Sequence, residues 1–98
     1  VPGASLVSNY DGILLEYKYT VNFTSGGKIS MVSIATTSGK ALEIFVEGVD
    51  KNGTKFIGSQ VEGSDRVLFQ YSAPNLTDDD MSDVRETLKL FTNTHKLK

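Results

Sequence analysis

Few side chains in this sequence are of a type that could carry out a reaction. The chain has one histidine, His95, and no cysteine, which excludes thiolate nucleophiles, thiolate metal sites and most histidine-based triads. Asp78, Asp79 and Asp80 could attract a hard cation, but three adjacent carboxylates lack the spaced ligands of a calcium loop and are typical of a helix start. We therefore expect a chain that is not an enzyme and has no metal site and no cofactor.

Phosphate and nucleic-acid binding are also disfavoured by the sequence. The glycine-containing segments fall between predicted strands, whereas a phosphate cradle needs a glycine-rich turn between a strand and a helix. The formal net charge is −2, so the excess of lysine and arginine needed to neutralise a nucleic-acid backbone is missing. The remaining class of function is peptide recognition, by a sheet edge, by a groove beside a helix or by a charged patch.

Alternating apolar and polar residues predict the strands that would position such a surface. Residues 15–23 alternate with a period of two, as in a strand with one buried and one solvent-facing side. Further strands are predicted at 29–36, 42–46, 55–61 and 67–72, and a sixth at 5–10, with glycine-containing turns between them. Asn52-Gly53 predicts a type I′ hairpin, and Gly58 predicts an interruption of the strand that follows.

The last third of the chain changes to a helical period. Thr77 and Asp80 have the spacing of a capping box, and three aspartates occupy the first turn, where the helix dipole favours negative charge. Apolar residues then recur at helical spacing to form one stripe, Met81, Val84, Leu88 and Phe91. A helix over about 78–92 is expected to pack this stripe on the sheet.

Ninety-eight residues are enough for one compact domain. We expect a single domain over 1–98, with its strands over about 5–73, and no membrane-spanning segment. Three Asn-x-Thr triplets begin at Asn22, Asn52 and Asn75 and would be N-glycosylation acceptors if the chain were exported. Short asparagine-containing turns also produce such triplets by chance.

The expected architecture is similar to the pleckstrin-homology superfold: an α+β fold in which an antiparallel meander of five to seven strands, a barrel or sandwich, is closed by one C-terminal helix. The sequence also resembles the N-terminal pleckstrin-homology domain of a core subunit of the transcription and DNA-repair factor TFIIH. The resemblance lies in three stretches: residues 11–15, residues 25–34, and residues 68–71 taken together with 84–88. That family docks acidic, intrinsically disordered segments of transcription and nucleotide-excision-repair proteins.

The resemblance implies a nuclear protein-interaction module of a multi-subunit assembly, without direct contacts to nucleic acid or membrane. The peptide-binding residues expected on this basis are Lys40, Phe45, Arg85, Lys28 and Lys55. Lys40 falls where the family has a basic residue before a central strand, and Arg85 where it has a helical lysine. The sequence departs from the family at Glu43 and Glu47, which would repel an acidic peptide on the face that carries Phe45.

Two other functions stay open at this stage. The three Asn-x-Thr triplets and the first residue, Val1, also fit a small secreted effector or toxin-like domain without enzymatic activity. A lipid-headgroup binder of the same fold would need a denser basic cluster than Lys28, Lys51 and Lys55 provide.

Overall fold

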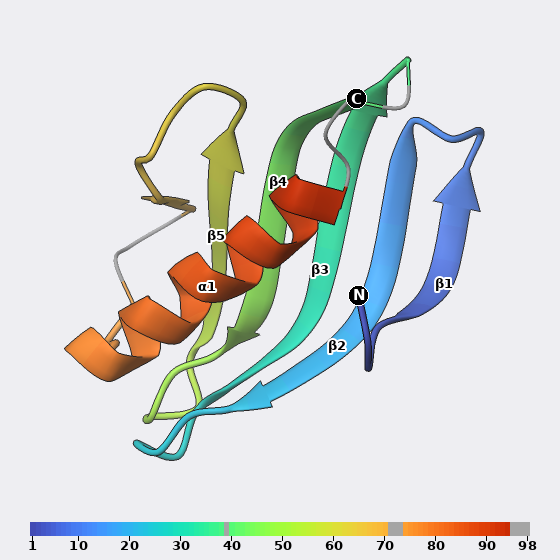
Figure 1. Cartoon of the computed structure of the whole chain (residues 1–98). Helices are drawn as coiled ribbons and strands as arrows, with labels where there is room; N and C mark the ends of the chain where they lie inside the picture. Colours follow the sequence, from blue (N-terminus) through green and yellow to red (C-terminus); the bar gives the residue numbers. More distant parts are fainter. Residues whose placement is uncertain (39, 71–73, 95–98) are drawn as a thin grey trace.

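The computed structural model describes residues 1–38, 40–70 and 74–94. It contains six strands and one helix, and their order along the chain follows the predicted order (Figure 1). The strands are β1 Ser5–Tyr10, β2 Leu14–Asn22, β3 Lys28–Thr37, β4 Lys40–Val49, β5 Lys55–Val61 and β6 Leu68–Phe69, and the helix is α1 Asp78–Thr94.

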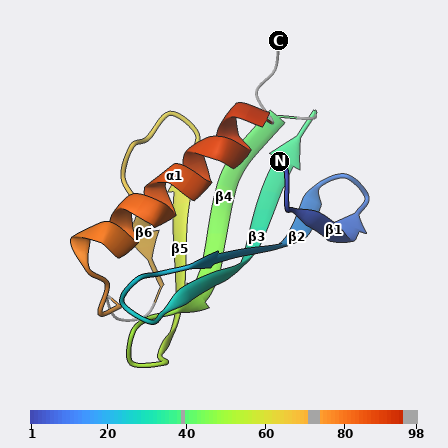
Figure 2. The same ribbon diagram turned by 60° about the horizontal axis from the view of Figure 1, so that its bottom comes forward.

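All six strands form one antiparallel sheet in the order β1-β2-β3-β4-β5-β6, with each strand paired to its neighbours in sequence. The α+β meander with one C-terminal helix is therefore confirmed. Among the described residues the sheet is open and does not close into a barrel, because β1 and β6 are its two edges. The helix lies on one face of this single curved sheet (Figure 2).

The core lies between the helix and the face of the sheet that it covers. Its buried members are Phe23, directly after β2, β-branched and aromatic residues of the strands, and the apolar stripe of the helix: Phe23, Ile29, Val32, Ile34, Ile44, Val46, Phe56, Val84, Leu88 and Phe91. Phe91 packs on the rings of Tyr17 and Tyr19 in β2, with ring-centroid distances of 5.5 and 5.3 Å. These contacts place the C-terminal half of the helix over the middle of the sheet.

The helix begins with the predicted capping box. Thr77 Oγ1 accepts the backbone N–H of Asp80 at 3.1 Å, and Asp80 Oδ2 accepts the backbone N–H of Thr77 at 3.2 Å. Asp80 is fully buried and also accepts the Ser25 hydroxyl at 2.8 Å, so the cap is tied to the β2–β3 turn. The helix continues to Thr94, two residues beyond the predicted end.

The hairpin between β4 and β5 differs from the predicted type I′ turn. That turn needs positive φ at both central residues, but only Gly53 has one, with φ +79°. The Asp50 carbonyl accepts Gly53 N–H at 2.9 Å, and Asp50 N–H donates to the Thr54 carbonyl at 2.9 Å. These two bonds define a longer loop, closed by a left-handed glycine.

Two strand predictions also need correction. β5 runs without interruption through Gly58, since the missing side chain makes room for the ring of Phe69, which would lie 2.9 Å from a Cβ at this position. The last predicted strand, 67–72, is reduced to the two residues of β6, and its end at residues 71 and 72 lies outside the described residues.

Candidate binding groove

One groove of about 910 Å³ lies between the C-terminal half of α1 and the ends of β4 and β5. We call it the helix groove. Its lining residues come from the start of β4, from the end of β5 with the loop that follows, and from the helix: Lys40, Ala41, Leu42, Glu43, Ile44, Gln60, Val61, Glu62, Gly63, Ser64, Asp65, Arg85, Lys89, Thr92 and Asn93. The volume is in the range of sites that hold small ligands or short peptide segments.

The groove exists because the helix crosses the sheet diagonally. Its first turn lies near β5 and β6 and its last turns lie over β3 and β4, so the upper ends of β4 and β5 stay uncovered (Figure 1). The loop between β5 and β6 forms the opposite rim, and a bond from Glu62 N–H to the Leu42 carbonyl, 2.8 Å, holds the start of this loop against β4.

The helix provides the basic wall of the groove. Arg85, Lys89, Thr92 and Asn93 follow one another at positions i, i+4, i+7 and i+8, which lie on one side of a helix. Their direction is fixed by the apolar stripe, because Val84 and Leu88 are fully buried against the sheet. Among the described residues, no carboxylate lies within ion-pair distance of Arg85 or Lys89.

The strands provide an apolar floor. The register of β3 against β4 shifts between Ala35 and Thr36, so Leu42 is an extra residue in β4 and its side chain is 43% exposed. Val61 at the end of β5 is 41% exposed. Leu42 lines the groove, so an occupant could bury it with a gain of about 25 cal/mol per Å² of apolar surface. Val61 also lines the groove, but it is the cross-strand neighbour of Glu43, so its side chain belongs to the opposite face of the sheet.

The opposite wall is acidic. Glu62 and Asp65 of the β5–β6 loop line it, and Lys40 forms an ion pair with Glu62 at the rim. The two charges of this pair largely compensate each other. Among the described residues, this leaves the helix wall without carboxylate partners, facing Asp65 on the loop side. One wall of the groove is therefore positively charged and the other negatively charged, and this difference would orient an occupant.

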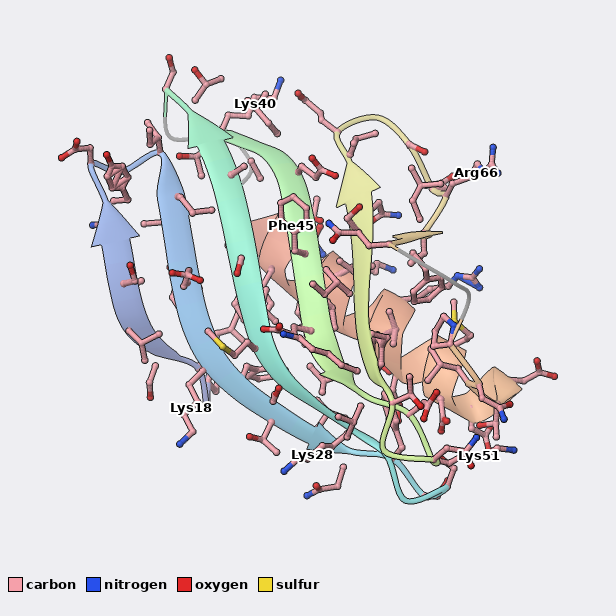
Figure 3. The ribbon with its side chains drawn as sticks, turned by 180° about the vertical axis from the view of Figure 1, so that it is seen from behind. Lys18, Lys28, Lys40, Phe45, Lys51 and Arg66 are labelled. Atoms are coloured by element: carbon pink, nitrogen blue, oxygen red, sulfur yellow. The ribbon has the colours of Figure 1, made fainter. Side chains whose placement is uncertain are left out.

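The five predicted binding residues do not form one site. Lys40 and Arg85 both line the helix groove. Phe45 projects from the middle of β4 on the opposite face of the sheet, where Ser33 and Ser59 are its cross-strand neighbours (Figure 3). An alternating strand sends neighbouring residues to opposite faces, so Phe45 is directed away from the groove that Ile44 lines.

Lys28 and Lys55 lie at the other end of the sheet. They are the two cross-strand neighbours of Val49, and β4 carries Lys40 at its opposite end, nine residues or roughly 30 Å away. Lys55 forms an ion pair with Glu47 at 2.7 Å. Glu43 and Glu47 are each two residues from Phe45 and share its face of the sheet, and Glu47 pairs there with Lys55.

Sequence reasoning missed Lys89 and the acidic wall. Lys89 could have been found from its helical spacing to Arg85, since residues four apart share a side of a helix. Glu62 and Asp65 carry no such signal, because their place opposite the helix depends on the path of the β5–β6 loop.

A second polar cluster, around Asp50, supports the fold. The Asp50 carboxylate is 3% exposed and accepts the backbone N–H groups of Asn52, Thr54 and Asn75 at 2.9, 3.0 and 3.0 Å. The bond from Asn75, more than the other two, holds the pKa of Asp50 below its ordinary value, although burial acts in the opposite direction. This carboxylate ties the β4–β5 hairpin to the segment that precedes the helix.

Across residues 1–38, 40–70 and 74–94, no group of three or more histidine, cysteine, aspartate or glutamate side chains is placed to hold a metal ion. The single described helix is not long and apolar enough to span a membrane. His95 lies outside the described residues.

Comparison of the chain with protein-family models, with curated proteins and with solved structures finds no match. The predicted relation to the pleckstrin-homology domain of TFIIH therefore stays a prediction, as do the nuclear location and the absence of enzyme activity.

Proposed function

We propose that this domain is a protein-interaction module that docks an extended acidic segment of another protein in the helix groove. The observation that carries the proposal is the pair of cations Arg85 and Lys89, which have no carboxylate partner in the part of the chain that the structure describes, beside the exposed Leu42. Acidic side chains would pair with the helix wall, and an apolar side chain would cover Leu42.

The spacing of the two cations defines the sequence pattern of the partner. Residues four apart on a helix are separated by about 6 Å along its axis. In an extended peptide, residues two apart point to the same side and are separated by about 6.6 Å. A segment with acidic residues at alternate positions, lying along the helix, would therefore bring one carboxylate to Arg85 and the next to Lys89.

The acidic wall of the groove determines which residues fit between the acidic residues of the partner segment. The intervening residues of an extended segment point away from the helix, toward Asp65 of the β5–β6 loop. Neutral or basic residues suit these positions, since a uniformly acidic segment would place like charges together. The proposed partner thus alternates acidic residues with neutral, basic or apolar ones.

The contribution of Arg85 and Lys89 to the binding free energy can be bounded from the strength of exposed ion pairs. Each such pair contributes about 0.2–1 kcal/mol, so the replacement of both Arg85 and Lys89 by alanine should weaken binding roughly two- to thirtyfold. The affinity should also fall with added salt, because exposed charge pairs are screened.

A titration followed by NMR tests the proposal. The probe is a synthetic peptide of about ten residues with glutamate at alternate positions and one central leucine. Backbone amide shifts should gather around Leu42, Val61 and Arg85 and leave residues near Phe45 and Lys28 unchanged. Shifts that gather on the Phe45 face, or no shifts at low ionic strength, would contradict the proposal.

A further inference from the structure

The three Asn-x-Thr triplets, which the groove does not involve, share a structural feature. Asn22, Asn52 and Asn75 are all exposed. In the described part of the chain, none of their side-chain amides takes part in a hydrogen bond: the bonds recorded at Asn52 and Asn75 use the backbone N–H only. The fold therefore does not require an amide at these three positions.

Backbone conformation does not explain the asparagines either. Asparagine is favoured where φ is positive, but within residues 1–38, 40–70 and 74–94 the positive-φ residues other than glycine are Asp11 and Ser38. Asn9, which is not in a triplet, shows the contrast, because its Oδ1 accepts the Gly12 N–H at 2.8 Å and closes the β1–β2 turn. Five asparagines in a chain with 19 serines and threonines would give about one triplet by chance.

The fold brings the three triplets to one end of the molecule. The Asp50 carboxylate binds the backbone N–H groups of both Asn52 and Asn75. Asn22 pairs with Lys28 across the β2–β3 turn, and Lys28 pairs with Val49, the residue before Asp50. This end, at the bottom of Figure 1, is separated from Lys40 and the helix groove by the length of β4, roughly 30 Å.

We propose that Asn22, Asn52 and Asn75 carry N-linked glycans. In the modification, the side-chain Nδ2 displaces a lipid diphosphate from C1 of the oligosaccharide on a lipid-linked donor. The Nδ2–C1 bond forms, the C1–O bond to the diphosphate breaks, and the amide loses one proton. The donor and the transferase belong to the secretory pathway, and Thr24, Thr54 and Thr77 complete the acceptor triplets.

The proposal is independent of the function proposed for the groove. Glycans at the three positions would project from one end of the domain into solvent and leave the groove at the other end open to a partner. A chain modified in this way has passed through the secretory pathway, which agrees with the secreted alternative and disagrees with the nuclear location implied by the resemblance.

Peptide mass spectrometry of the protein isolated from its own cells tests the proposal. Peptide N-glycosidase in ¹⁸O-labelled water converts each glycosylated asparagine to ¹⁸O-labelled aspartate. We expect the label at Asn22, Asn52 and Asn75 and unlabelled asparagine at Asn9 and Asn93. Unmodified asparagine at all three triplet positions would overturn the proposal.

Secretion of the full chain from eukaryotic cells behind an added signal sequence gives an independent readout. The intact mass should show three glycans, and Asn22→Gln, Asn52→Gln and Asn75→Gln should each remove one. Thr54→Ser should keep the Asn52 glycan and Thr54→Val should remove it, because the transferase requires a hydroxyl two residues on. Asn93→Gln, outside any triplet, should change nothing. Secreted protein without glycans would contradict the proposal.

Discussion

The packing of the helix on the sheet is tested by two leucines of the same helix. Leu88 is fully buried in the core and Leu90 is 43% exposed, so Leu→Ala at the two positions changes helix propensity equally and burial very differently. A buried leucine replaced by alanine costs about 2–5 kcal/mol, of which part is the cavity left behind. We expect that loss in the free energy of unfolding for Leu88→Ala and less than about 1 kcal/mol for Leu90→Ala.

Urea unfolding followed by circular dichroism measures both changes. With a slope of about 2 kcal/mol per M for a small domain, the midpoint for Leu88→Ala should fall by about 1–2.5 M, and the midpoint for Leu90→Ala should stay close to that of the wild type. Total stability for a chain of this size is about 5–15 kcal/mol, so the Leu88 variant should remain folded in water or become marginal. Equal losses at the two positions would refute the arrangement of helix and sheet.

Three further outcomes follow from single sites. The pKa of Asp50 is lowered in the folded state. The stability that the Asp50 carboxylate contributes is therefore complete above the unfolded pKa of about 3.9 and is lost as pH falls through the folded pKa. Asp50→Asn should flatten the dependence of the urea midpoint on acidic pH, and an unchanged acid profile would contradict this. Gly48→Ala would push a Cβ against the backbone of Lys28 and should lower the melting temperature by at least about 4 °C; wild-type melting would refute the close pairing of β3 and β4. Glu62→Gln removes the partner of Lys40 in the groove and should strengthen binding of the alternating acidic peptide up to about fivefold; unchanged affinity, measured by calorimetry, would mean that Lys40 lies outside the bound segment.

The elements with strong local signals were predictable. The period of two in residues 15–23 corresponds to β2, and Thr77 and Asp80 form the expected capping box. Val84, Leu88 and Phe91 are buried as expected, while Met81, at the margin of the stripe, is only partly buried. These features depend on residues close in sequence, where side-chain spacing and backbone hydrogen bonding decide the structure.

The groove was only half predictable because it depends on contacts between distant segments. Alternation along β4 placed Phe45 and Ile44 on opposite sides but did not show which side the helix would cover. The extra residue at Leu42 and the path of the loop from Glu62 have no local signature, so the acidic wall could not be anticipated. Gly58 was misinterpreted for the same reason, since its role is to admit the ring of Phe69 from a later strand.

The proposed docking function is tested most directly by the affinity of two peptides with the same composition. One has glutamates at alternate positions, and the other has them adjacent, so only the first can place successive carboxylates beside Arg85 and Lys89 along the helix. Calorimetric titration at low ionic strength should show tighter binding of the alternating peptide, by up to about fivefold for the one additional ion pair, and Arg85→Ala/Lys89→Ala should abolish that difference. Equal affinities, or a preference that survives the double substitution, would contradict the groove as the docking site.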